Sequence, residues 1–188
     1  MFQLYLKLGI AHIADWQGYD HILFVAMLCA VYTFRQWKTV VVLVTAFTIG
    51  HSITLALASL QVIRLSSAWV EFLIPVTIFL TAMGNIVTGG SAKLVRLKYV
   101  AALFFGLIHG LGFSTYLRSL LGGSSVVKPL LAFNIGVEIG QLIIVLCILI
   151  LTAIFVNLAR IKQRDWILTL SGAGAGISFI LLMERLPM

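Results

Sequence analysis

The sequence predicts an all-α polytopic membrane protein with about six transmembrane helices. The chain of 188 residues is 61% hydrophobic and only 10% charged, whereas a soluble domain carries about 25% charged residues. Several apolar runs reach the roughly 20 residues that a helix needs to cross a bilayer. No long polar linker separates these runs, so we expect residues 1–188 to form a single transmembrane domain.

The predicted helices follow the apolar runs in order. Residues 1–14 are apolar but short, and they predict an amphipathic or re-entrant helix before the first full span. The fifth span is longer than a bilayer requires, at a rise of about 1.5 Å per residue. The six full spans are expected at about 19–34, 39–61, 68–88, 97–120, 126–158 and 164–184.

The basic residues predict how the chain is oriented. The loops after the first, third and fifth spans carry eight of them: Arg35, Lys38, Lys93, Arg96, Lys98, Arg160, Lys162 and Arg164. The opposite side carries five: Lys7, Arg64, Arg118, Lys128 and Arg185. The positive-inside rule then makes the first side cytoplasmic and leaves both termini outside. The Lys and Arg residues behind the net charge of +7 lie in short loops between apolar runs, as membrane topology requires. We therefore expect a lipid bilayer as partner and no nucleic acid.

Ionisable side chains converge in the outer half of this predicted bundle. The span directions bring His21, His51, His109 and Glu138 to overlapping depths on four different helices. An ionisable residue inside a membrane is expensive unless it is paired or hydrated, and it marks a functional site by default. Because four helices each place an ionisable residue at a similar depth, the sequence predicts that these residues share one polar site.

The local spacings agree with such a site. Thr48 and His51 are three residues apart, so the hydroxyl group can lie beside the ring. A second polar face has the spacing i, i+4, i+7 and consists of Asn134, Glu138 and Gln141. These neighbours are expected to support the site or to line a path through it.

The charge balance points to a bound cation. Three carboxylates lie near or inside the membrane, and no Lys or Arg is expected deep enough to neutralise them: Asp20, Glu71 and Glu138. If these groups ionise, protons or a metal ion must join them. The four imidazoles of His12, His21, His51 and His109 can ligate a divalent metal. Imidazole with carboxylate suits zinc, nickel, cobalt or iron, and the lack of Cys or Met beside the histidines disfavours copper(I).

Four stretches carry a family resemblance: 9–24, 46–55, 105–113 and 133–141. On these residues the chain resembles the HupE/UreJ family of small bacterial membrane proteins, which is described as nickel/cobalt permeases and is associated with hydrogenase and urease accessory functions. The resemblance implies a bacterial cytoplasmic (inner) membrane, possible partners in metalloenzyme maturation, and a nickel or cobalt ion; zinc is added by the ligand chemistry alone. The residues that it implies contact the metal are His12, Asp20, His21, His51, His109 and Glu138.

The first motif departs from the better-studied nickel permeases. Seven residues separate His12 from Asp20, which is more than in their compact His-to-Asp-His motif. The chain therefore resembles a second branch of the family. This departure weakens the implication of nickel specifically and leaves the implication of a metal site intact.

Two functions fit the predicted site, and the permease is favoured. A permease would capture a divalent transition metal in the outer half, but the inner half offers Asn85 and little else polar for release. The alternative is an intramembrane zinc-dependent hydrolase, in which three histidines leave one coordination position open for an activated water. Glu138 or Asp20 would then be the general base. Residues expected around the site or along a pathway are Thr48, Ser52, Glu71, Ser114, Asn134 and Gln141.

Overall fold

A computed structural model describes residues 1–16, 18–89, 95–121 and 127–187. This part of the chain contains eight α-helices, two short helical segments and no strand, which confirms the all-α class. In order, the elements are α1 (Phe2–Ile13), α2 (Asp20–Cys29), η1 (Phe34–Gln36), α3 (Trp37–Ser59), α4 (Ser67–Thr88), α5 (Val95–Gly112), α6 (Ser114–Leu121), α7 (Val127–Thr152), η3 (Ala153–Leu158) and α8 (Gln163–Glu184).

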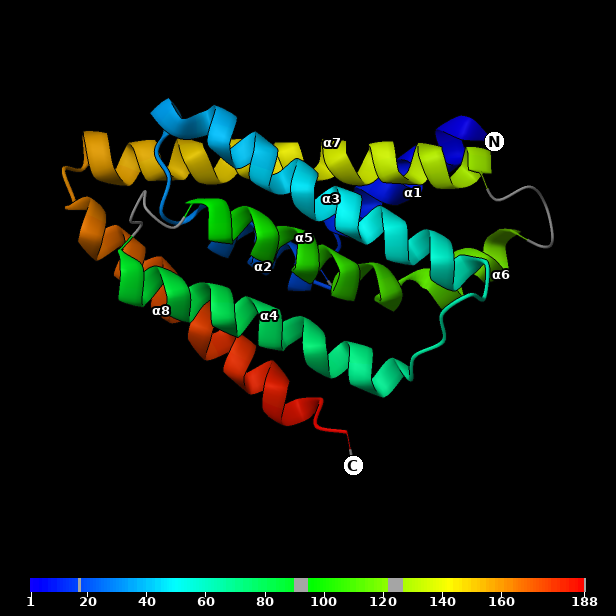
Figure 1. The fold of residues 1–188 in the computed structure, drawn as a ribbon. Helices are drawn as coiled ribbons and strands as arrows, with labels where there is room; N and C mark the ends of the chain where they lie inside the picture. Colours follow the sequence, from blue (N-terminus) through cyan, green and yellow to red (C-terminus); the bar gives the residue numbers. More distant parts are fainter. Residues whose placement is uncertain (17, 90–94, 122–126, 188) are drawn as a thin grey trace.

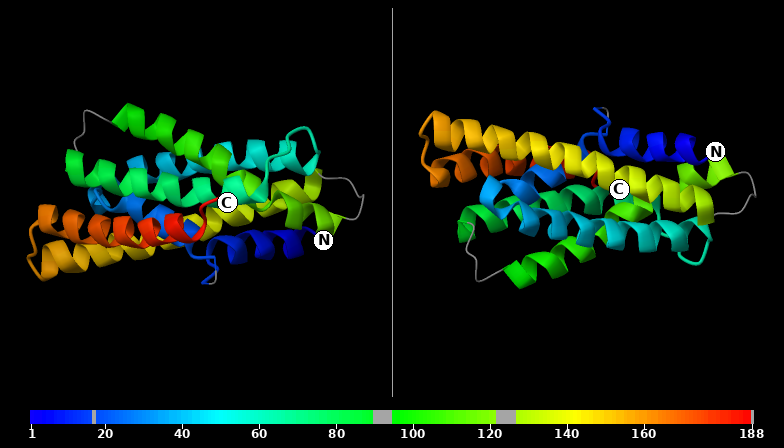
Figure 2. Two further views of the ribbon diagram at one scale, coloured as in Figure 1. Left: turned by 90° about the horizontal axis from the view of Figure 1, so that it is seen from below. Right: turned by 90° about the horizontal axis from the view of Figure 1, so that it is seen from above.

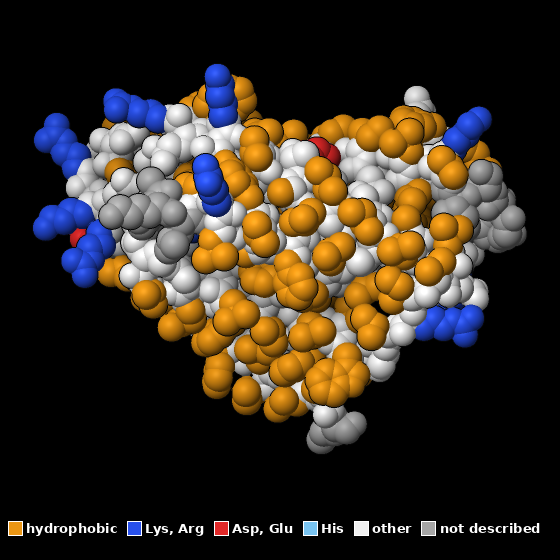
Figure 3. Space-filling model, in the orientation of Figure 1, with side chains coloured by type: hydrophobic (Ala, Val, Ile, Leu, Met, Phe, Trp, Pro, Cys, Tyr) orange, Lys and Arg blue, Asp and Glu red, His pale blue; other side chains and the backbone are white. Residues whose placement is uncertain are grey.

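Five helical stretches are long and apolar enough to cross a membrane: Phe34–Ser59, Ser67–Thr88, Val95–Gly112, Val127–Leu158 and Gln163–Glu184. They confirm a polytopic membrane protein. Lys and Arg gather at the two ends of the face in Figure 3, more densely at the end where α7 leads into α8, with an apolar surface between. Lys93, which contributed to the predicted orientation, lies outside the described residues.

The first predicted span, 19–34, is shorter than expected. Helix α2 has ten residues and α1 has twelve, so each covers about half of a bilayer at 1.5 Å per residue. The two helices occupy opposite halves of the long axis of the molecule (Figures 1 and 2). Together they make one broken crossing. The break contains Asp15 and Gly18, which both disfavour a helix interior.

The fourth predicted span, 97–120, is also divided. Helix α5 ends at Gly112 and α6 begins at Ser114, with Phe113 between them. Gly110 and Gly112 weaken the end of α5, because glycine is one of the poorest helix formers. Helix α6 then packs against α3.

Glycines bring four of the helices into backbone contact, in two pairs. A Cβ atom at Gly9 or Gly136 would overlap the backbone of the other helix of the pair α1/α7. A Cβ atom at Gly50 or Gly106 would do the same in the pair α3/α5. In each pair the helices run parallel, but the two pairs run in opposite directions (Figures 1 and 2). The bundle therefore contains two oppositely directed copies of one packing arrangement.

The same sequence pattern underlies both copies. Gly9 and Gly106 each precede a histidine by three residues, and each packs against the carbonyl oxygen of a phenylalanine. Those phenylalanines begin two similar stretches, Phe47-Thr-Ile-Gly and Phe133-Asn-Ile-Gly. The polar site lies between the two pairs. It is flanked by a large apolar core on α2, α3 and α4 and a smaller one on α1, α6 and α7.

Candidate metal centre

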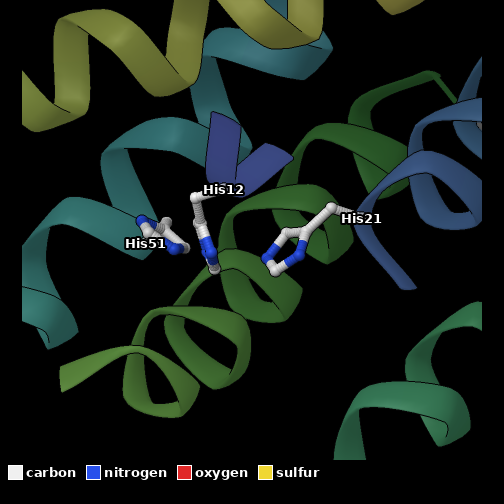
Figure 4. A group of neighbouring side chains, drawn as sticks. All are labelled: His12, His21 and His51. Carbon is white, nitrogen blue, oxygen red and sulfur yellow. The ribbon is translucent and has the colours of Figure 1, made fainter. Parts of the chain in front are cut away.

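Three histidines from three helices meet at the break in the first crossing. Figure 4 shows the rings of His12, His21 and His51 turned toward one another, with His12 between the other two. Each offers a ligand atom, and these atoms lie within 4.8 Å of one another. This group is called the three-histidine centre below.

Local structure explains why the rings converge. His12 is in the last turn of α1 and His21 is in the first turn of α2, so the break places both beside the same gap. Gly50 lets α3 approach α5 closely immediately before His51. The ring centroid of His12 lies 4.6 Å from that of His21 and 6.0 Å from that of His51.

The ring nitrogens are buried but unused. His12 Nε2, His21 Nε2 and both ring nitrogens of His51 have no hydrogen-bond partner among the described residues. A buried polar atom without a partner costs about 1–3 kcal/mol. A metal ion at the centre of the group would take up the lone pair of one nitrogen from each of the three rings, and imidazole suits zinc, nickel, cobalt and iron.

Aromatic rings close the space around the centre. Phe113 lies 4.1 Å and Phe133 5.6 Å from His12, measured between ring centroids, and Phe47 stacks 6.1 Å from His51. These side chains limit water around the imidazoles and restrict their rotation. Phe113 was not anticipated from the sequence, because its position depends on the division between α5 and α6.

His109 is next to the centre but outside the group of three. Its ring is fully buried and lies 5.2 Å from that of His21. Its Nε2 atom is 2.8 Å from Thr77 Oγ1, while Nδ1 has no partner in the described part of the chain. Thr77 was not singled out in the sequence, since a threonine in an apolar run is ordinary.

The carboxylates have other partners. Arg185 Nη1 lies 2.9 Å from Asp20 Oδ2, so the expectation that no Lys or Arg reaches this acid is wrong. The reason is that α8 ends near the break and the long arginine side chain covers the remaining distance. Glu138 accepts a 2.7 Å hydrogen bond from Thr45. Within the described residues, neither Asp20 nor Glu138 belongs to the three-histidine centre.

The profile of the family described as "HupE / UreJ protein" matches residues 1–185. The chain belongs to the HupE/UreJ family. Neither the curated proteins nor the solved structures that were searched gave a match.

The remaining polar residues of this HupE/UreJ protein support the helices around the centre. Thr48 donates to Gln141 at 2.7 Å and so joins α3 to α7. Ser52 donates to a backbone carbonyl one turn earlier in α3, and Ser114, at the start of α6, donates to the carbonyl of Leu111 at the end of α5. Asn134 Oδ1 and Gln141 Nε2 are buried without a partner among the described residues.

Glu71 lies at the surface of this HupE/UreJ protein. Its side chain is exposed and accepts a 2.8 Å hydrogen bond from Ser67, one turn earlier in α4. It therefore stabilises the start of α4, and within the described residues it does not belong to the three-histidine centre.

A cavity of about 400 Å³ leads to the centre from outside. It is lined by residues of α1, of the break after it, and of the α5/α6 junction, including His12, Asp15 and Phe113. His12 is half-buried, whereas His21 and His51 are buried, so His12 is the imidazole of the centre that this cavity reaches. We call this space the access cavity.

Proposed function

We propose that this protein is a permease for a divalent transition metal ion of the nickel or cobalt type, which it binds at the three-histidine centre. The supporting observation is the convergence of three imidazoles, with unpartnered nitrogens, from three separate helices. Membership of the HupE/UreJ family agrees with this function, because the family is associated with nickel and cobalt transport.

The fold suits transport. Many carriers are built from repeats of opposite direction, with the binding site between the repeats and formed by discontinuous helices. Here the broken crossing α1/α2 and the opposed pairs α1/α7 and α3/α5 supply both features. The ion would enter from the access cavity, meet His12, and then be held by His21 and His51.

The metallohydrolase alternative has less support. Its general base would have to lie beside the metal-bound water. Asp20 is paired with Arg185, and Glu138 is bonded to Thr45, outside the group of ligand atoms. Ser52 and Ser114 both donate to backbone carbonyls. The geometry thus supplies metal ligands more clearly than it supplies catalytic groups.

The direction of transport follows from the charge distribution. We place the more basic end, with Arg35, Lys38 and Arg160, in the cytoplasm of a bacterium, which leaves both termini outside the inner membrane. The access cavity lies in the half of the long axis that contains α1, and so faces outward. The ion would then move inward, toward proteins that mature metalloenzymes.

Uptake into proteoliposomes tests this function. Purified protein is reconstituted around a metal-sensitive dye, and nickel, cobalt or zinc is added outside. We expect uptake by the native protein and its loss in His21→Ala and His51→Ala. Ser171→Ala is the matched control, because Ser171 is fully buried on α8 and also lacks a partner in the described chain. Equal uptake by native protein and empty liposomes would reject the permease.

Elemental analysis separates the two functions. The protein is purified in mild detergent beside a His51→Ala/His109→Ala variant. A permease should retain little metal but bind nickel or cobalt reversibly on titration. One tightly held zinc ion per chain, lost in the variant and accompanied by no uptake, would favour the hydrolase.

A further inference from the structure

We propose that the ion leaves the three-histidine centre through a second cavity, between α2, α4 and α5, which it reaches by way of His109. This inference rests on the proposed permease function and adds the route of release. The second cavity is called the release cavity below.

The release cavity has a volume of about 200 Å³. A water molecule takes about 30 Å³ of liquid volume, so the space is large enough for an ion with a few waters. Most of the lining is apolar, and the polar contacts would come from Thr81, Asn85 and Thr88 on α4. It is lined by the second half of α4, the first half of α5 and Leu28 of α2. It therefore lies on the opposite side of the histidines from the access cavity, toward the more basic end.

A line of oxygen atoms connects His109 with this cavity. Thr77, Thr81, Asn85 and Thr88 have the spacing i, i+4, i+8 and i+11, which places them on one face of α4. Thr77 contacts His109, and the other three line the cavity. The eleven residue-to-residue steps from Thr77 to Thr88 cover about 16 Å along the helix. Sequence reasoning recognised only Asn85 on this path.

The donors on this face are already occupied. The hydroxyl groups of Thr81 and Thr88 donate to carbonyl oxygens of their own helix, each at 2.7 Å. The Asn85 amide donates to the carbonyl oxygen of Met27 at 2.7 Å. What the two threonines have left for a ligand is oxygen lone pairs, and Asn85 adds its side-chain carbonyl oxygen beside one remaining N–H. Oxygen lone pairs favour a cation over an anion.

The same reasoning assigns the proton on His109. Thr77 Oγ1 donates to the carbonyl oxygen of Ile74 at 2.7 Å, so toward His109 it acts as acceptor. A neutral imidazole carries one proton, and here that proton belongs on Nε2. The unpartnered Nδ1 atom then carries the lone pair that a metal requires.

This order of ligands favours release. An ion at the centre is held by imidazoles, which bind transition metals well, whereas hydroxyl and amide oxygens suit harder ions such as Mg²⁺ and Ca²⁺. Passing from His109 to Thr81 and Asn85 therefore weakens binding stepwise while water replaces the nitrogen ligands. A carrier needs such weakening to discharge a tightly bound ion.

Lys98 is the charged residue among the described residues that line the cavity. Its Nζ atom lies 5.4 Å from the centre of the Tyr32 ring, a cation–π distance. This contact draws the ammonium group toward the chain between α2 and α3. A positive charge there repels a cation that moves in either direction, so it weakens the retention of an ion in the cavity and does not set the direction of movement.

A plug in the release cavity tests the route. Gly84 lines the cavity, and a Cβ atom there would meet nothing within 4 Å, so Gly84→Leu fills the space without displacing backbone. Gly176→Leu on α8 is the matched control, since its Cβ atom also meets nothing. We expect Gly84→Leu to bind nickel in detergent as the native protein does but to take it up about tenfold more slowly. Gly176→Leu should match the native protein in both assays.

Thr81→Val provides an independent variant that removes one oxygen without changing the volume greatly. It too should slow uptake and leave binding unchanged. The route is overturned if both variants transport nickel at the native rate, or if either one slows uptake only by weakening binding. Failure of the native protein itself to bind or transport metal would instead reject the permease. Thermal unfolding of each variant shows that a slow rate does not come from unfolded protein.

Discussion

The pairs α1/α7 and α5/α3 share one packing arrangement but carry different side chains. Each pair has a Gly-x-x-His stretch on one helix and a Phe-x-x-Gly stretch on the other. After the second glycine the copies diverge: α3 has His51 where α7 has Val137. The backbone is thus repeated, while the ligand set is not.

The histidines of the two copies also differ in surroundings. Helix α1 stops one residue after His12, which leaves that ring half-buried at the access cavity. Helix α5 continues past His109, whose ring is fully buried and bonded to Thr77. In the proposed route, these equivalent positions would therefore serve opposite ends: His12 would receive the ion and His109 would pass it on.

The largest expected effect comes from making α3 resemble α7. His51→Val replaces a ligand of the centre by the residue type at the equivalent position of α7. We expect the affinity for nickel or cobalt to fall about 100-fold or more, which corresponds to at least about 2.7 kcal/mol. Isothermal titration in detergent measures it, with Ser52→Ala as control. An affinity within threefold of the native value would show that His51 is not a ligand.

The next effect tests the shared packing. Gly9→Ala and Gly106→Ala each place a methyl group against a backbone carbonyl of the partner helix. Overpacking of this kind costs about 1–3 kcal/mol, so we expect both to lower the midpoint of thermal unfolding by similar amounts. Gly172→Ala, whose added methyl group meets nothing, should leave the midpoint unchanged. A large drop in one pair only would show that the two interfaces are not equivalent.

A third prediction separates the two equivalent histidines. His12→Ala should weaken metal binding, because His12 belongs to the three-histidine centre. His109→Ala should leave equilibrium binding near native and slow uptake about tenfold. Parallel titration and proteoliposome assays distinguish the two effects. Equal loss of binding in both variants would make His109 a fourth ligand of the same site.

The sequence predicted the membrane class and the polar side chains but not their partners. The low charge and the apolar runs were sufficient for an all-α polytopic protein, because a helix crossing a bilayer must be long and apolar. Span direction predicted overlapping depths for His51 and His109, and in the structure both rings lie beside that of His21. The broken first crossing was missed, since residues 19–34 remain apolar after α2 ends at Cys29.

Contacts between distant segments could not be obtained in this way. The pairing of Asp20 with Arg185 joins residues at opposite ends of the chain, and nothing in the local sequence marks it. The polar face of α4 with Thr77, Thr81, Asn85 and Thr88 was not predicted, because a threonine in a helix commonly donates its hydroxyl hydrogen bond to the carbonyl one turn earlier. Only their position beside His109 and a cavity gives them a further role.

The smallest expected effect concerns this Asp20–Arg185 pair, which has no counterpart in the α5/α3 copy. Asp20 precedes His21, so the guanidinium group adds a positive charge near a site that binds cations. Arg185→Gln should raise the affinity for nickel about two- to fivefold, and Asp20→Asn should lower it by a similar factor, because a partly exposed pair is screened by solvent.

The opposite changes in nickel affinity distinguish an electrostatic effect of the pair from a purely structural one. If the pair only anchors the end of α8 to α2, both variants remove the same contact and should lower the affinity and the unfolding midpoint together. If Arg185 instead competes with the ion for Asp20, the affinities diverge and the difference shrinks as salt is added. Titrations of both variants at low and high ionic strength decide this. Affinities that change in opposite directions would show that the arriving metal displaces Arg185 from Asp20. The α5/α3 copy would need no such pair, because His109 is already held by its contact with Thr77.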